Sequence, residues 1–206
     1  MEQIVIIGGG GHAKVLIDCL EKEGKYQIAG VLDDHPNVNQ VLHYKVHRRG
    51  NMPEFMGLPT IIAIGNGEVR QKIAAECATT FITTVHPTAV VSKYAKIGVG
   101  SQIFAGAVLN ADASVGDHCI VNTGAVVEHD CIIQDFVHVS PNASLAGGVS
   151  VGAFTHIGIG ATVIENVTIG SHVIIGAGAV VVDDIPDHCT AVGIPAKPIK
   201  FNNSPL

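Results

Sequence analysis

The sequence has few aromatic and few charged residues. It contains no tryptophan, and aromatic residues make up 4% and charged residues 15% of the chain. Disordered chains combine low hydrophobicity with high charge, so a chain that is 47% hydrophobic does not belong to that class. With so few rings and 24 glycines, the core must be filled by small branched side chains, and the chain must turn often. A length of 206 residues allows one large domain or two small ones.

The chain also lacks a basic surplus, paired cysteines and a long apolar run. Its formal net charge of -6 offers no attraction to a phosphate backbone, which argues against a nucleic-acid partner. The five cysteines form no CxxC motif, as expected of reduced thiols in a cytosolic protein. No apolar run approaches the ~18 residues of a membrane helix, and no basic segment precedes the apolar N-terminus as in a secretory signal. These absences predict a soluble cytoplasmic protein without a membrane span.

The most prominent positive feature is an unbroken period of six residues. From Val85 to Val181, every sixth residue is Val, Ile or Leu, and a second series of every sixth residue, from Ala89 to Ala179, contains only small residues and valines. A period of six fits neither a helical face nor an alternating strand, and it is typical of a β-solenoid. Each hexad would supply a short strand and a corner, and three hexads would close one coil. Coils about 4.8 Å apart would then form a prism of just over five coils, with residues after Val181 as its cap.

The residues before the repeat predict a small α/β domain. Apolar strands are expected over 3–7, 26–34 and 60–66, and helices over 12–23 and 67–78. Strands that alternate with helices favour a Rossmann-like parallel sheet. We therefore expect a sheet domain in residues 1–84 and a β-helix with its C-terminal cap in residues 85–206. The segment 35–50 gives no clear prediction.

A glycine-rich turn follows the first strand, and an acidic pair, Asp33 and Asp34, follows the second. The pattern is similar to the dinucleotide fingerprint, but that signal is weak because the expected sheet is short. An NAD-dependent reaction remains an alternative. Backbone N–H groups at a helix N-terminus attract any phosphate, so a nucleotide diphosphate would serve as well. His12 in this turn could contact a substrate, or it could be an ordinary polar residue at a helix start.

One histidine of the repeat differs from the others because carboxylates flank it. His129 lies between Glu128 and Asp130 in the segment "VVEHDC". A carboxylate paired with one ring nitrogen fixes the tautomer and makes the other nitrogen more basic, as a general base requires. The alternative is a charged cluster on a solvated surface. His138 and His156 are 18 residues apart and should stack on adjacent coils at one corner. The repeat contains no ligand set typical of zinc, so we expect no metal site.

At this point the sequence resembles a known family. The segments "IIGGGGHAKV", "LDD", "AIGN", "EHDC", "HVSP" and "VGIPAK" are similar, in order and separation, to bacterial nucleotide-sugar acetyltransferases. These include the N-acetyltransferases of UDP-4-amino sugars and of perosamine, and sialic acid O-acetyltransferases share the architecture. The resemblance extends from about residue 3 to 200. It implies a left-handed parallel β-helix, acetyl-CoA as co-substrate, no metal, and homotrimers with active sites between neighbouring prisms.

The resemblance also implies roles for individual residues. His129 would be the catalytic base and Asp130 would raise its basicity, with Glu128 and Asn122 beside them in the active site. The nucleotide sugar would contact Gly10, Gly11, His12, Asp33, Asp34 and Gly65. Acetyl-CoA would contact His138, Ile159 and Ala177.

The reaction implied is direct transfer of an acetyl group to the amine of a nucleotide-linked amino sugar, as a step in surface-glycan synthesis. Three alternatives remain open at this stage. The acceptor could be a hydroxyl of sialic acid or a related sugar, since an imidazole base serves both reactions. The solenoid could be a non-catalytic sugar-binding scaffold, or the enzyme could use NAD.

Overall fold

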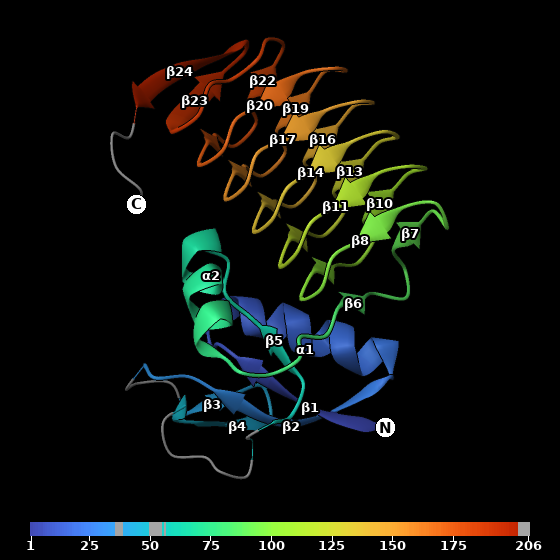
Figure 1. The fold of residues 1–206 in the computed structure, drawn as a ribbon, viewed down its shortest axis with the longest axis vertical. Helices are drawn as coiled ribbons and strands as arrows, with labels where there is room; N and C mark the ends of the chain where they lie inside the picture. The colour runs from blue at the N-terminus through green and yellow to red at the C-terminus, as the bar shows by residue number, and fades with distance from the viewer. Residues whose placement is uncertain (36–38, 50–54, 56, 202–206) are drawn as a thin grey trace.

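The computed structural model describes residues 1–35, 39–49, 55 and 57–201, and it consists of two parts in direct contact (Figure 1). An α/β domain with a mainly parallel sheet is followed by a left-handed parallel β-helix, which confirms the predicted fold class. Helix α1 lies between the sheet and the β-helix (Figure 1). Helix α2 buries Ile73 against Val5 and Ile7, on the other face of the sheet, and reaches the β-helix through Arg70. None of the described helices is long and apolar enough to cross a membrane.

The N-terminal sheet has the strand order β3-β4-β2-β1-β5. All neighbours are parallel except the antiparallel pair of β3 and β4. The elements are β1 Glu2–Ile7, α1 Gly11–Glu23, β2 Tyr26–Leu32, β3 Gln40–Val41, β4 Tyr44–His47, β5 Thr60–Ile62 and α2 Gly67–Glu76. Each expected element is present, although β2 and β5 end earlier than expected. The β3–β4 hairpin lies in segment 35–50, of which residues 36–38 and 50 are outside the described residues.

Local signals explain the helix ends. The apolar side of α1, with Ala13, Leu16 and Leu20, is buried against the sheet. Gly24 ends this helix in the left-handed conformation (φ 68°), where its N–H donates to the Leu20 carbonyl. Helix α2 begins at Asn66, whose side chain accepts a hydrogen bond from the N–H of Val69.

The β-helix consists of seventeen two-residue strands, each ending at one of the predicted aliphatic positions. These strands are β6 Thr84–Val85, β7 Val90–Val91, β8 Lys96–Ile97, β9 Gln102–Ile103, β10 Val108–Leu109, β11 Ser114–Val115, β12 Ile120–Val121, β13 Val126–Val127, β14 Ile132–Ile133, β15 His138–Val139, β16 Ser144–Leu145, β17 Ser150–Val151, β18 His156–Ile157, β19 Thr162–Val163, β20 Thr168–Ile169, β21 Ile174–Ile175 and β22 Val180–Val181. Paired residues are 18 positions apart, as in Val108 and Val126. The prediction of three hexads per coil is therefore confirmed.

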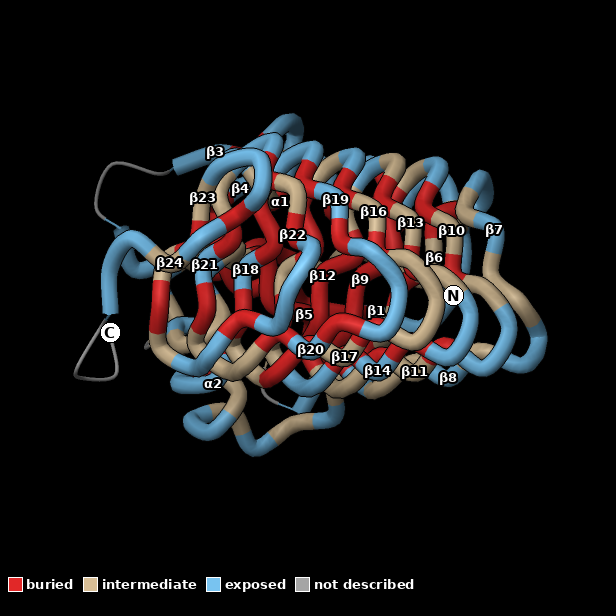
Figure 2. The backbone as a smooth tube through the Cα atoms, turned by 90° about the horizontal axis from the view of Figure 1, so that it is seen from above, coloured by how far each residue is buried: buried red, intermediate tan, exposed pale blue. Residues whose placement is uncertain are grey.

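Every third strand belongs to the same face of the prism. The first face contains β6, β9, β12, β15, β18 and β21, and the second contains β7, β10, β13, β16, β19 and β22. The third face contains β8, β11, β14, β17 and β20. The period's aliphatic and small residues fill the interior, and Figure 2 shows the buried positions along the inside of the coils.

The corners repeat with the same period. Every sixth residue from Gly100 to Gly178 has a positive φ, including bulky ones such as Phe136 (φ 60°). Most L residues avoid this region, and here the coil geometry imposes it at each corner. At the corner between the third and first faces, the rings of His118, Phe136, Phe154 and His172 stack with centroids 5.2, 5.3 and 4.7 Å apart.

The end of the prism is closed by an antiparallel hairpin of β23 Cys189–Gly193 and β24 Ala196–Phe201, with β23 paired to β21. The expected departure from the repeat after Val181 is thus a capping hairpin. At the opposite end, the first face packs on the α/β domain. Phe104 and Ile120 of this face share a buried cluster with α1 and β1, and the Gln102 side chain donates to the Ile62 carbonyl at 2.7 Å.

Candidate active site

His129 lies at the corner between the second and third faces, after β13 and before β14. Its Nδ1 is 2.8 Å from Oδ2 of Asp130, and its side chain is 63% exposed. The hydrogen bond to Asp130 raises the pKa of His129, and the charge of Glu128 acts in the same direction. A neutral ring that donates from Nδ1 has an unprotonated Nε2, so this exposed nitrogen can accept a proton.

Gly147, on the next coil, leaves space for that ring. A Cβ added at Gly147 would lie 2.5 Å from Cε1 and 2.7 Å from Nε2 of His129. A side chain at the position that stacks on residue 129 would therefore displace the ring from this place, and Gly147 is not among the site residues expected from the sequence. The signal was available, because 147 is 129 plus one coil of 18 residues.

His138 forms a second group on the first face, at the start of β15. The Asn122 amide oxygen accepts from the N–H of Thr123 at 2.8 Å, so its Nδ2 is the donor to Nε2 of His138 at 3.1 Å. Burial lowers the pKa of His138 to about 3, with His156 and Arg70 acting in the same direction. The Nδ1 atom of His138 is buried and has no hydrogen-bond partner within the described part of the chain. The Nδ1 side of the ring faces the Gly65 backbone, which acts on the pKa in the opposite direction to burial, so the neutral imidazole lies against the loop after β5.

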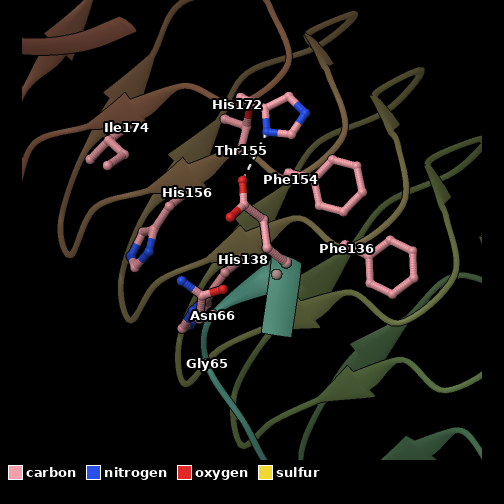
Figure 3. A pocket seen from close by; sticks show the side chains of 11 residues that line it. Gly65, Asn66, Phe136, His138, Phe154, Thr155, His156, His172 and Ile174 are labelled. Carbon is pink, nitrogen blue, oxygen red and sulfur yellow. Dashed lines mark hydrogen bonds and ion pairs between the residues drawn. The ribbon is translucent and has the colours of Figure 1, made fainter. Parts of the chain in front are cut away.

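A pocket of about 90 Å³ lies between the first face and the start of α2. Its lining includes Gly65 and Asn66 before α2, and His138 and His156 of the first face (Figure 3). The rings of these two histidines lie 4.7 Å apart on adjacent coils, as their spacing predicted. The expected corner position is wrong, because the two residues begin strands β15 and β18. His172 at the upper rim forms an ion pair with Glu68 of α2 at 3.2 Å. The pocket thus joins the two domains.

The predicted nucleotide-sugar residues gather at the carboxyl ends of β1, β2 and β5. Gly10 is the N-cap of α1 and Gly11 its first residue, and no side chain caps this helix. His12 turns toward the β-helix, where its Nε2 is 2.9 Å from Oε1 of Gln102, and burial lowers its pKa. Gly65 follows β5 and faces the His138 ring. The uncapped N–H groups at the start of α1 and the backbone of Gly65 therefore lie at the same edge of the sheet, on the side of the β-helix.

The two aspartates have partners within the domain. Asp33 accepts hydrogen bonds from the N–H groups of Gly9 at 2.6 Å and His35 at 2.7 Å. Asp34 is paired with Arg49, with 2.7 Å between Oδ2 and Nε. Both aspartates line a hollow of about 120 Å³ with Gly8 and Ile64 at the same edge of the sheet. Since Asp33 holds the glycine-rich turn, its direct effect is on the shape of that turn.

Ile159 and Ala177 occupy equivalent positions on adjacent coils at the corner between the first and second faces. The N–H of Gly178 donates to the Ile159 carbonyl at 2.8 Å. Ile159 is 54% exposed. Asn122 lies at the same corner, so these three predicted residues are brought together along one edge of the prism.

One predicted group is kept apart from the rest. His129 occupies the corner opposite the first face, whereas His138, His12 and Gly65 lie on or against that face. A single copy of this chain therefore does not bring the imidazole of His129 to the pocket beside His138.

Among the residues that the structure describes, no group of three or more His, Cys, Asp or Glu side chains could hold a metal ion. Arg70 of α2 is fully buried between the domains and is not among the site residues expected from the sequence. Its position inside a short amphipathic helix gave no indication of this location.

Comparisons with known proteins find similar acetyltransferases. Residues 3–77 match the model of the PglD N-terminal domain. A curated UDP-N-acetylbacillosamine N-acetyltransferase of Bacillus subtilis (strain 168) is 42% identical over 122 residues, which cover 51% of this chain and 52% of that protein. The chain therefore aligns with about half the length of this curated relative.

Two solved structures match over nearly the whole chain. One is a histidine-to-alanine variant of the GDP-perosamine N-acetyltransferase from Caulobacter crescentus in complex with CoA and GDP-perosamine. It is 42% identical with a TM-score of 0.92, and the match covers 97% of this chain and 98% of that one. The other is the acetyltransferase domain of PglB from Neisseria gonorrhoeae FA1090, 37% identical with a TM-score of 0.88 and coverages of 97% and 100%.

Proposed function

The chain belongs to the family of nucleotide-sugar N-acetyltransferases built on a left-handed β-helix, and from this premise we propose that it transfers the acetyl group of acetyl-CoA to the amine of a nucleotide-linked amino sugar. The observation that carries the proposal is the exposed His129 imidazole, whose Nδ1 is held by Asp130 at 2.8 Å while Nε2 stays free. The C. crescentus relative, crystallised with CoA and GDP-perosamine, supports the same pair of substrates.

In the proposed reaction, the neutral amine of the sugar attacks the thioester carbonyl carbon. Nε2 of His129 takes a proton from the amine as the new C–N bond forms, and Asp130 stabilises the imidazolium through Nδ1–H. The tetrahedral intermediate then collapses, the C–S bond breaks, and the imidazolium returns the proton to the departing thiolate. The products are the amide and CoA–SH, and no covalent enzyme intermediate is needed.

Two regions are proposed to hold the substrates. The diphosphate of the acceptor would approach the free N–H groups of Gly10 and Gly11 at the start of α1. The acetyl-CoA arm would follow the edge that carries Ile159 and Ala177, with its thioester near the His138 side chain, which lines the pocket. His12 and Gly65 lie where the two regions meet, beside His138.

The complete site is proposed to form between copies in a homotrimer. Within one chain, His129 and His138 belong to opposite sides of the prism, so the imidazole base of one subunit would serve the pocket of its neighbour. Mixed trimers test this arrangement. Refolding the inactive variants His129→Ala and His138→Ala together should restore part of the activity, because some interfaces pair two intact histidines. If mixtures stay as inactive as the separate variants, the shared site is wrong.

The direct test of function is release of the CoA thiol from acetyl-CoA. We expect release with GDP-perosamine or a UDP-linked 4-amino sugar, and little with sialic acid, whose acceptor is a hydroxyl. Replacing His129 with alanine should lower kcat by at least about 100-fold, within the range of general-base contributions, while acetyl-CoA affinity changes little. Release with sialic acid alone would reassign the acceptor, and full turnover by His129→Ala would remove this imidazole from the reaction.

A further inference from the structure

Arg70 of α2 is a fully buried cation without a carboxylate partner among the described residues. Its guanidinium makes five hydrogen bonds, one for each N–H that it carries. The acceptors are all backbone carbonyls, those of His118 (2.9 Å), Ile64 (3.0 Å), Gly65 (2.7 Å), Phe136 (2.7 Å) and Val137 (3.3 Å). Burial lowers the pKa of Arg70 to about 10, so the group remains charged at neutral pH.

These acceptors belong to two separate parts of the site. Ile64 and Gly65 form the loop after β5, where the nucleotide sugar is proposed to bind. Phe136 and Val137 directly precede His138, the residue proposed to lie beside the thioester. The planar guanidinium therefore fixes the loop after β5 relative to the strand that carries His138.

The close approach of Gly67 to the β-helix supports this geometry. A Cβ added at Gly67 would lie 2.6 Å from the Phe136 carbonyl oxygen, which is shorter than any normal contact. The start of α2 and the corner of the prism therefore lie too close for a side chain at position 67 to fit between them without a shift. Both residues affect the distance between the start of α2 and the corner of the β-helix at Phe136. Arg70 does so through its hydrogen bonds, and Gly67 does so because it has no side chain.

We propose that Arg70 is a positioning residue that sets the distance between the nucleotide-sugar loop and His138, and so aligns the acceptor amine with the thioester. This inference rests on the proposed function. It predicts that a variant with weaker Arg70 contacts still binds the nucleotide sugar and still binds acetyl-CoA. The acceptor amine and the thioester would, however, no longer be aligned with each other. Since a displacement of about 1 Å can cost about 100-fold in rate, kcat should fall far more than either binding constant.

Arg70→Lys is the informative variant, because lysine keeps the charge but has three donors on a single nitrogen and cannot span the five carbonyls. We expect kcat with GDP-perosamine or a UDP-linked 4-amino sugar to fall by about 10- to 100-fold. Titration calorimetry should give unchanged Kd values and unchanged stoichiometry for acetyl-CoA and for the nucleotide sugar separately. The matched control is Lys72→Met, on the exposed side of the same helix, which should behave as wild type.

Gly67→Ala is the second variant, because it keeps the guanidinium and widens the same contact. It should lower kcat with the same unchanged binary binding, and it decides the question if Arg70→Lys does not fold. Wild-type kcat in a folded variant would overturn the proposal. A loss of kcat matched by an equal loss of binding stoichiometry would also overturn it, since that result indicates a purely structural role. Wild-type protein that releases no thiol with any amino-sugar nucleotide would instead refute the proposed function.

Discussion

Replacing Gly147 with alanine should displace the proposed base without disturbing the fold. The new Cβ would lie 2.5 Å from Cε1 of His129, whereas carbon atoms in contact are separated by about 3.5 Å or more. The ring must therefore move by roughly 1 Å. Because it is an exposed side chain, it can turn away at little energetic cost, and we expect stability to change by no more than about 0.5 kcal/mol.

The rate should respond more strongly than the stability. A misplacement of about 1 Å is associated with losses of up to about 100-fold, so we expect kcat in the thiol-release assay to fall by about 10- to 100-fold. The melting temperature and the affinity for acetyl-CoA should remain those of wild type. Glu165→Ala is the matched control, because it places alanine at the equivalent position one coil further on, away from the ring.

Two results would contradict this reasoning. If Gly147→Ala turned over at the wild-type rate, the position of the His129 ring over Gly147 would not be the position in which it acts. If Glu165→Ala lost activity to the same extent, the effect would belong to the corner as a whole and not to the imidazole.

Three further outcomes are expected. Asp130→Asn should lower the pKa of His129, so the acidic limb of the kcat–pH profile should move to lower pH, since the base acts in its neutral form; an unmoved limb would exclude this pairing. Because the pKa of His138 is depressed to about 3, below roughly 6.5 for an unfolded histidine, its contribution to stability is present above pH ~6.5 and is lost as the pH falls toward 3. The free energy of unfolding, measured with urea, should therefore decrease less between pH 7 and pH 5 in His138→Gln than in wild type. The two decreases should differ by up to roughly 1.4 kcal/mol for each pH unit below the unfolded pKa. Equal decreases in the two proteins would contradict a depressed pKa for His138. Leu145→Ala, at a fully buried position, should cost about 2–5 kcal/mol in the same assay, against a small effect for Ser144→Ala on the outer side of the same strand.

The β-helix could be predicted almost residue by residue because its coils repeat a local rule. Each strand ends at an aliphatic position of the period, from Val85 to Val181. The corner geometry was not foreseen in the same detail, since positive φ values occur at residues as different as Gly124 and Phe136. There the coil closure overrides the preference of the individual residue.

The arrangement of the site was harder to predict, because it depends on contacts between distant segments. Arg70 binds carbonyls up to 67 positions away, and a backbone acceptor has no sequence signature. Gly147 could have been found from the 18-residue coil. The opposite placement of His129 and His138 also follows from that period, since nine residues are half a coil.

The 18-residue register has a consequence for how such a chain can change length. Removing or adding one whole coil would leave every later side chain pointing in its original direction, so the prism could lengthen or shorten while its chemistry stayed in place. An insertion of a single hexad would preserve the buried aliphatic pattern equally well, yet it would rotate everything beyond it by a third of a turn. A duplication that looks harmless in an alignment could thus carry His138 away from the α/β domain, and natural length variation should favour multiples of eighteen.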